Sequence, residues 1–356
     1  MQRYVEPLTF ALVMFPLAAA LFTLPYVLYS YRRYGSILPM RVLCVYAFIF
    51  YLMCVYCLAI LPFPSADTVV TQHVGLNLIP FSYVPEILTA TVAFSIKDPS
   101  TWMSAFFASG LYEPVLNILM FLPLGVFLRY YFGWGRRRTV LTALALSLFL
   151  EVTQYTATYG LAPFRYRLSD VNDLIHNTLG GLLGYAVTPF LTGFLPSRER
   201  LNQLSYQRGR RVSYIRRLMA FLTDQALVSG AATMLGCFLP RNWSYVALVI
   251  LLGVLAGQCG GATPGKLLVR IRVADAGGGS ARLWQHLARC LMLHVGVARL
   301  DIFFGGAGVL LSFLLLTAAF LGAVKGGIRN RPQTMFDRWT HTMVESSIPC
   351  PQEDTP

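Results

Sequence analysis

Five long stretches of the sequence contain no aspartate, glutamate, lysine or arginine, and they limit the folds that are open to this chain. They cover residues 7–31, 42–66, 174–197, 242–265 and 302–324. Each is longer than the roughly 20 apolar residues that an α-helix needs to cross the hydrocarbon core of a bilayer. The chain is 56% hydrophobic and only 13% charged, whereas a soluble domain carries about 25% charged residues. The sequence therefore predicts an all-α, polytopic membrane protein.

The apolar segments and the polar segments between them predict about nine transmembrane helices in two helical domains. We expect these helices near residues 8–29, 42–61, 114–132, 139–158, 173–195, 214–238, 243–259, 283–300 and 303–324. The eighth segment is the most polar of them, because it contains Gln285, His286, Arg289 and His294. If that segment lies along the membrane interface instead of crossing it, the number of crossings falls to eight.

Basic residues account for the net charge of +13, and they gather in alternate connections between the apolar segments. The positive-inside rule places these connections in the cytoplasm, next to anionic lipid. It predicts a multi-pass protein of the cell membrane with its N-terminus outside and its C-terminus in the cytoplasm. Only Arg3 precedes the first apolar stretch, whereas Arg32 and Arg33 follow it, so we expect an uncleaved helix and no signal peptide. The charge does not require a nucleic-acid partner.

A basic segment at 196–213 has no apolar face wide enough to span a membrane, and it predicts a cytoplasmic linker between two domains. The predicted division has an N-terminal helix and basic loop at 1–40, a first membrane domain at 41–195, the linker, a second membrane domain at 214–344, and a tail at 345–356.

Two short patterns suggest cofactor chemistry, but neither is complete. Cys54 and Cys57 form a CxxC pair inside an apolar segment, and no second pair accompanies it, so we interpret the seven cysteines as small hydrophobic residues. GGATPGK at 260–266 has the glycine and lysine spacing of a phosphate-binding loop, but Leu267 stands where serine or threonine would bind Mg²⁺. We expect no nucleotide, no metal and no other cofactor. The alternation in LLVRIRV at 267–273 predicts a short amphipathic strand instead.

A buried carboxylate marks the first half of the chain. Glu151 has twelve uncharged residues before it and thirteen after it, and Gln154 lies on the same helix face. A carboxylate at that depth costs several kcal/mol unless it is paired, protonated or next to a polar cavity. An ion pair with Arg165 or Arg167, in the next loop, is one explanation, and a functional site is the other.

The stretch RLSDVNDLIHNTLGGLLGY, residues 167–185, continues this polar edge into the next predicted helix. At 100° per residue, one stripe about 60° wide contains Asp173, Asn177, Gly180 and Gly184. His176 lies beside the stripe. Asp170 or Asn172 can cap the helix N-terminus, which leaves Asp173 available for another role. The two glycines allow another backbone to come close. Asn117, near the outer end of the predicted helix 114–132, can face the same polar cavity as Glu151 and Asp173.

The order and spacing of four motifs across residues 40–195 resemble the VanZ-like family. The motifs are NLIPF at 77–81, the set Asn117, Pro123 and Gly125, the pair Glu151 and Gln154, and the run from Arg167 through Asp170, Asp173 and Asn177 to the glycines. Asn172 departs from the pattern, since an acidic residue is expected beside Asp173. The resemblance implies an association with resistance to teicoplanin, a glycopeptide antibiotic, in Gram-positive bacteria.

Residues 214–344 resemble the RDD family. The resemblance rests on Arg217, Asp224, the GxTxGK turn, Arg289 and Asp337. Charged side chains inside a membrane need partners. We therefore expect Arg217, Asp224, Arg289 and Asp337 to form a charge network that joins the helices, and the alternative is ion transport.

The leading functional hypothesis is a cell-envelope protein that binds or moves an amphiphile at an outward-facing site in the membrane. The ligand would be a phospholipid, a lipid-linked envelope precursor or a glycopeptide, with Arg167 holding an anionic group. The residues expected to line the site are Asn117, Glu151, Gln154, Arg167, Asp170, Asp173, His176 and Asn177. One alternative is an intramembrane lipid hydrolase or transferase with Glu151 and Asp173 as general base and acid. Another is an ion-coupled transporter in which Glu151 and Asp224 titrate.

Overall fold

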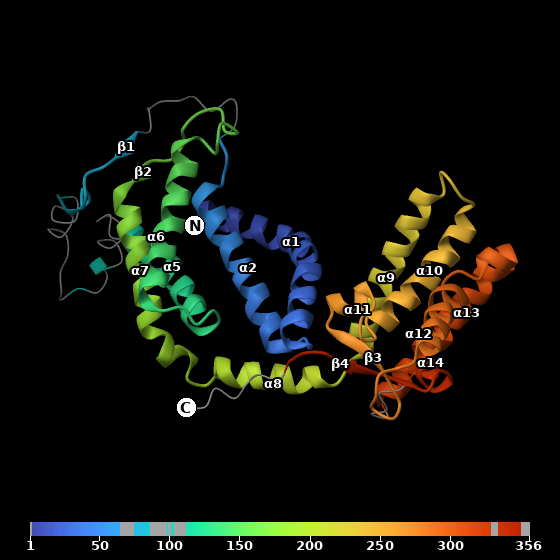
Figure 1. Ribbon diagram of the computed structural model, residues 1–356. Coiled ribbons are helices and arrows are strands. Elements are labelled where there is room, and N and C mark those ends of the chain that lie inside the picture. Colours follow the sequence, from blue (N-terminus) through green and yellow to red (C-terminus); the bar gives the residue numbers. More distant parts are fainter. Residues whose placement is uncertain are drawn as a thin grey trace. The chain divides into compact units, whose positions relative to one another are not determined.

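The computed structural model describes residues 2–64, 75–85, 98, 101–102, 112–328 and 334–349, with side chains left undescribed at 2–4 and 319–328. The chain divides into two compact units. Unit 1 consists of Met1–Phe22 and Pro39–Leu201, and unit 2 consists of Thr23–Leu38 and Asn202–Pro356. An amphipathic piece that the sequence suggests at 86–107 lies almost entirely outside the described residues. Each unit is described by itself (Figure 1).

Unit 1 is a bundle of long helices (Figure 1). It contains the first part of α1 (Gln2–Tyr34), α2 (Pro39–Ile60), α5 (Tyr112–Tyr130), α6 (Arg136–Tyr155) and α7 (Val171–Thr192). Two short strands, β1 (Leu76–Asn77) and β2 (Ser169–Asp170), pair in parallel at one end. The core is formed by apolar residues of α2, α5 and α6, namely Val55, Ala59, Ile60, Phe121, Leu124, Leu128, Ala143 and Leu150.

Helices α5 and α7 pack against each other through their backbones. A Cβ atom added at Gly180 would clash with the Ile118 carbonyl oxygen, and one added at Gly184 would clash with that of Leu122. Gly125 on α5 meets the backbone of α7 in the same way. Small residues make such close approach possible. The glycine face of α7 is therefore the face that packs on α5.

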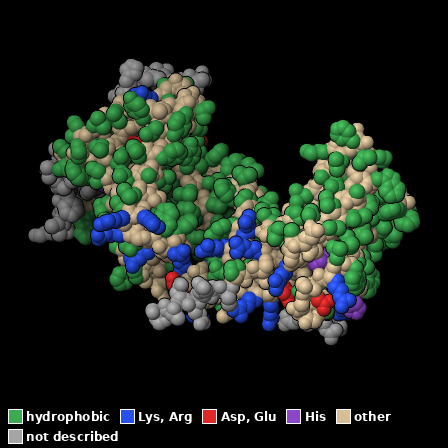
Figure 2. Space-filling view, in the orientation of Figure 1, with side chains coloured by type: hydrophobic (Ala, Val, Ile, Leu, Met, Phe, Trp, Pro, Cys, Tyr) green, Lys and Arg blue, Asp and Glu red, His purple; other side chains and the backbone are tan. Residues whose placement is uncertain are grey.

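The basic segment between the domains is a helix rather than an open linker. Helix α8 (Arg198–Arg210) buries Leu201 and Ser205, and the Ser205 carbonyl accepts a hydrogen bond of 2.6 Å from Ser36 Oγ. The basic residues of this helix are Arg198, Arg200, Arg208 and Arg210, and Figure 2 shows basic side chains, in blue, in this part of the molecule. Although the segment has no wide apolar face, two buried positions four residues apart are enough to hold one side of a helix.

Unit 2 contains helices and one antiparallel strand pair (Figure 1). Its long helices are α9 (Tyr214–Leu235), α10 (Arg241–Gln258) and α13 (Asp301–Ile328), and α12 (Leu283–Cys290) continues as a π-helix, η2 (Leu291–Val297). The short elements are α11 (Pro264–Leu268), α14 (Met335–Trp339), β3 (Ile271–Asp275) and β4 (Thr342–Ser346). The expected strand at 267–273 begins later, because Thr263 caps α11 and the first two leucines complete that helix.

The structure fits an all-α membrane protein, with two small strand pairs added. Within its described residues, five helices are long and apolar enough to cross a membrane. They are Val5–Tyr34, Pro39–Ile60, Tyr112–Tyr130, Tyr214–Leu235 and Asp301–Ala318. Every one of the nine expected segments contains helix, but the number of crossings stays a prediction. In the eighth segment, the side chains of Gln285, His286, Arg289 and His294 are buried.

Candidate functional site

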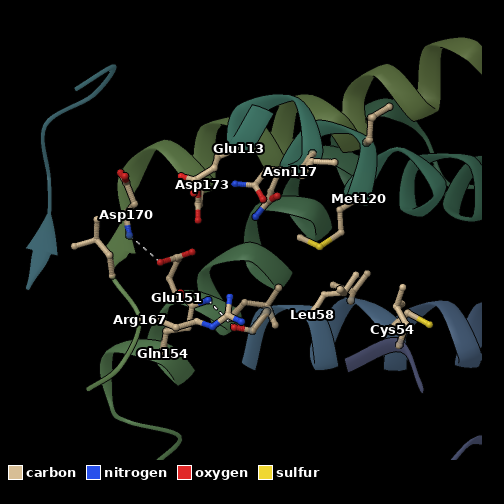
Figure 3. Close-up of a pocket in the computed structure, with 18 of the residues that line it drawn as sticks. Cys54, Leu58, Glu113, Asn117, Met120, Glu151, Gln154, Arg167, Asp170 and Asp173 are labelled. Atoms are coloured by element: carbon tan, nitrogen blue, oxygen red, sulfur yellow. Dashed lines mark hydrogen bonds between the residues drawn. The ribbon is translucent and has the colours of Figure 1, made fainter. Parts of the chain in front are cut away.

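A cavity of about 650 Å³ opens in unit 1, and its lining has two different ends. One end is apolar: Figure 3 shows Cys54 and Leu58 of α2 and Met120 of α5 on the side away from the carboxyl groups, and the lining also includes the apolar Leu8, Leu116 and Leu119. The other end is polar and is formed by α5, α6, α7 and the loop before α7 (Figure 3). Its polar residues are Glu113, Asn117, Glu151, Gln154, Arg167, Asp170, Asp173 and Asn177.

The Glu151 carboxylate is held by the backbone at the start of α7. Its Oε2 accepts a hydrogen bond of 2.9 Å from the Asp170 backbone N–H (Figure 3). Asp170 is itself the N-cap of α7, since its side chain accepts from the Asn172 backbone N–H at 2.8 Å. Because Asp170 caps the helix, Asp173 is free of that role and points into the cavity (Figure 3).

A second set of hydrogen bonds joins α5, α6 and α7. Asn117 Nδ2 donates to Asp173 Oδ1 at 2.6 Å. Asn177 Nδ2 donates to Ser147 Oγ at 2.9 Å, and Ser147 Oγ donates to the Asp173 carbonyl at 3.4 Å. The polar end is thus built from three helices that hold one another in register.

The loop before α7 is tied to the end of α2. Arg167 Nη2 donates to the Leu61 carbonyl at 2.5 Å, and the Tyr166 hydroxyl donates to the Ile60 carbonyl at 2.5 Å. Arg165 lies over the Tyr155 ring, 3.9 Å from its centroid. Among the described residues, neither arginine forms the ion pair with Glu151 that the sequence allowed.

The segment that contains NLIPF packs against the start of α7. Asn77 Nδ2 donates to Asp170 Oδ2 at 3.0 Å, and the Phe81 backbone N–H donates to Asn172 Oδ1 at 2.5 Å. Asn172 Nδ2 also lies 2.8 Å from Asp170 Oδ1, so an aspartate at position 172 would put two carboxylates together. The asparagine that departs from the family pattern therefore fastens this segment.

His176 lies apart from the cavity. Its Nε2 is 2.9 Å from the Tyr83 hydroxyl, and the two rings pack with centroids 5.3 Å apart. The structure thus brings seven of the eight expected residues to the cavity and places this histidine against the NLIPF segment. Two features of the lining were missed: Glu113 at the start of α5, and the whole apolar end. The charge of Glu113 just before a predicted span was a signal for the first, whereas nothing in the sequence indicates which apolar residues line a cavity.

In unit 2, three of the four expected network residues meet. Asp337 Oδ2 accepts from Arg217 Nη1 at 2.6 Å, and Asp337 Oδ1 accepts from Arg289 Nη1 at 2.5 Å. Burial by itself would raise the pKa of Asp337, but Arg289 and Arg217 hold that pKa below its usual value. The Asp337 side chain is completely buried, so α14 is locked onto α9 and α12.

Asp224, the fourth residue, belongs to a separate contact. Its Oδ2 accepts from Thr263 Oγ1 at 2.5 Å, and its Oδ1 accepts from the Gly265 backbone N–H at 2.7 Å. The Lys266 ammonium donates to Thr263 Oγ1 at 3.1 Å, and burial lowers the pKa of Lys266. The GxTxGK turn is therefore a docking element for α9.

Arg216 was not singled out by the sequence, yet it is fully buried. Its guanidinium donates to the carbonyls of Val269 at 2.7 Å, Arg270 at 2.6 Å and Gly209 at 2.9 Å. It stands next to Arg217 at the beginning of a predicted span, where two arginines are typical of a topology signal. Because the pair looks like a topology signal, nothing in the sequence indicated that Arg216 is a buried structural residue.

Comparison with protein families gives two matches. Residues 48–192 match the VanZ/LLP1 family model, and residues 211–341 match that of the RDD family. Both resemblances derived from the sequence motifs are confirmed, in the same order along the chain. Searches of curated proteins and of solved structures gave no match.

Proposed function

Since the chain carries a VanZ-like domain followed by an RDD domain in one multi-pass membrane protein, we propose that its first domain binds an amphiphile within the membrane. The ligand places its apolar chain against α1, α2 and α5 and its polar head at the ends of α6 and α7. Binding or moving such a ligand needs no covalent chemistry. On the family resemblance, we further propose that this activity serves the cell envelope and protection against glycopeptides such as teicoplanin.

The observation that carries this proposal is the division of the cavity into an apolar and a polar end. Its volume of about 650 Å³ falls in the range of about 300–1,000 Å³ that is usual for small-molecule sites. Such sites are mostly apolar with a few fixed polar groups, and here the polar groups are gathered at one end. An amphiphile has the same division.

The proposal is tested by filling the apolar end. Leu58→Trp adds volume to the cavity wall, and Leu43→Trp, on the exposed face of the same helix, is the matched control. Three hexadecyl probes carry a diazirine in the chain and end in an amine, a hydroxyl or a phosphate. In phosphatidylcholine nanodiscs, we expect Leu58→Trp to lose most cross-linking to cavity peptides for whichever probe binds, because the chain site is occupied.

Labelling of cavity peptides that is equal in the two tryptophan variants contradicts the proposal, as does the failure of all three probes to label them. Thermal unfolding of both variants checks that the fold is kept. In a glycopeptide-sensitive host, Leu58→Trp is also expected to lose any teicoplanin protection that Leu43→Trp retains.

We also propose nine crossings, with the N-terminus outside and the C-terminus in the cytoplasm. In that topology the α9–α10 connection lies outside, whereas the end of α10 lies inside. Cys237 and Cys259 are both exposed and mark these two places. In single-cysteine variants in intact cells, we expect a membrane-impermeant maleimide to label Cys237 and to spare Cys259 until the cells are opened. The reverse pattern contradicts the orientation.

A further inference from the structure

The hydrogen bonds at the polar end of the cavity fix which atoms are left to meet a ligand. Gln154 Nε2 donates to the Ala59 carbonyl at 3.0 Å. A carbonyl oxygen only accepts, so the amide orientation of Gln154 is determined by its partner. Its Oε1 is buried and has no partner among the described residues, and the side chain lines the cavity with 8% of the residue exposed.

The amide orientation of Asn177, on α7, is also determined by its hydrogen-bond partner. Ser147 Oγ gives its hydrogen to the Asp173 carbonyl, so it must accept the hydrogen of Asn177 Nδ2. Asn177 Oδ1 is therefore left as an acceptor, and it too lacks a partner in the described part of the chain. Asn177 is 3% exposed and lines the cavity. Each amide nitrogen uses one of its two hydrogens in these contacts, and both amide oxygens are buried acceptors without a partner among the described residues.

The ionisable side chains that line the cavity are also mostly hydrogen-bond acceptors. Among the described residues, four carboxyl groups line the cavity, namely those of Glu113, Glu151, Asp170 and Asp173, against a single guanidinium, that of Arg167. The Arg167 Nη2 donates to the Leu61 carbonyl. In Figure 3, Glu151 and Asp173 face each other across the polar end. This end of the cavity is therefore rich in acceptors and in carboxyl groups.

Building on the amphiphile-binding function proposed above, we propose that the head of the ligand is an organic ammonium, such as a protonated primary amine. An ammonium presents three donors and no acceptor, which suits the amide oxygens and the carboxylates together. Hydrogen bonds between charged groups are stronger than neutral ones, and a buried acceptor that stays unpaired is costly. A phosphate head would instead set acceptors against acceptors. This proposal differs from the sequence-based expectation that Arg167 holds an anion, and the amine and phosphate probes distinguish the two.

The three hexadecyl probes test this inference on the unaltered, full-length protein. They share one chain and one diazirine, so differences in labelling of the cavity peptides report the head group. We expect the amine probe to label these peptides about tenfold more than the phosphate probe, and clearly more than the hydroxyl probe. The Glu151→Gln/Asp173→Asn double variant should lose most of that preference, whereas Glu199→Gln, on the exposed face of α8, should keep it.

Each other outcome has a definite meaning. Equal labelling by the amine and hydroxyl probes, or a preference for phosphate, overturns the ammonium head while leaving amphiphile binding in place. Failure of all three probes to label the cavity overturns both proposals. The comparison of probes on the unaltered protein does not depend on the variants, so a double variant that fails to fold leaves the test intact. An amine preference that persists in a folded double variant also contradicts the inference.

Discussion

Replacing Asp337 with alanine is expected to destabilise unit 2 by about 3–5 kcal/mol, because it leaves two buried guanidinium groups without their counter-ion. Arg217 and Arg289 both donate to this carboxylate, and the Asp337 side chain is completely buried. The Thr334 backbone N–H also loses its acceptor, at present 2.7 Å away. The measurement is the unfolding temperature of the purified protein in nanodiscs, with protease resistance of the second domain as an independent readout.

The matched control is the exposed ion pair between β3 and β4. Arg272 Nη2 lies 3.3 Å from Glu345 Oε2, with 55% of the arginine side chain exposed. Exposed pairs contribute at most about 1 kcal/mol, so Arg272→Ala should change the unfolding temperature little. Equal effects of Asp337→Ala and Arg272→Ala would contradict a structural role for the buried triad.

The same network has a defined pH dependence. The folded pKa of Asp337 lies below its usual value, so its stabilisation is complete above the unfolded pKa of about 4 and is lost as the pH falls below that value. The difference in unfolding temperature between wild type and Asp337→Ala should therefore stay constant from pH 8 to pH 5.

Local chemistry was readable from the sequence where one residue determines the outcome. The charge-free stretches located five of the long helices, α1, α2, α7, α10 and α13, and the paired glycines at 180 and 184 indicated a face that another backbone approaches. Asp170 was identified as a possible cap of α7, and the structure assigns it that role. In each case the cause lies within one helical turn or one apolar segment of the residue concerned.

Hydrogen-bond partners that depend on the path of a loop could not be predicted from the sequence. An ion pair with an arginine was one of the two explanations offered for Glu151, but its carboxyl group accepts a backbone N–H instead. Between α6 and the next loop, Ala157, Thr158 and Tyr159 all adopt positive φ, a conformation that non-glycine residues rarely take and that their sequence does not announce. The path of this connection determines where the side chains of Arg165 and Arg167 lie relative to Glu151. Similarly, His176 points away from the cavity because Tyr83, 93 residues earlier in the chain, offers its hydroxyl on the other side.

Replacing Gly184 with alanine is expected to cost about 3 kcal/mol, although it adds only one methyl group. The new Cβ would meet the Leu122 carbonyl and the Gly125 Cα, which are backbone atoms of a packed helix and cannot rotate away. Overpacking of this kind costs about 1–3 kcal/mol and sometimes more, and here both helix backbones are in contact. The α5–α7 spacing also positions Asn117 on Asp173, so the polar end of the cavity should lose its order and cross-linking to the amphiphile probes should fall.

Gly230→Ala is the matched control, because the same substitution is expected to change the unfolding temperature in the opposite direction there. Gly230 lies inside α9, and a Cβ added there meets nothing within 4 Å. Alanine is favoured over glycine in a helix interior by about 1 kcal/mol, so this variant should keep or raise the unfolding temperature. The same chemical change is thus expected to act in opposite directions at two helical glycines, because only one of them faces another backbone. A Gly184→Ala protein as stable as Gly230→Ala would mean that α5 and α7 separate without penalty, and the glycine contact would then not be what holds the cavity in shape.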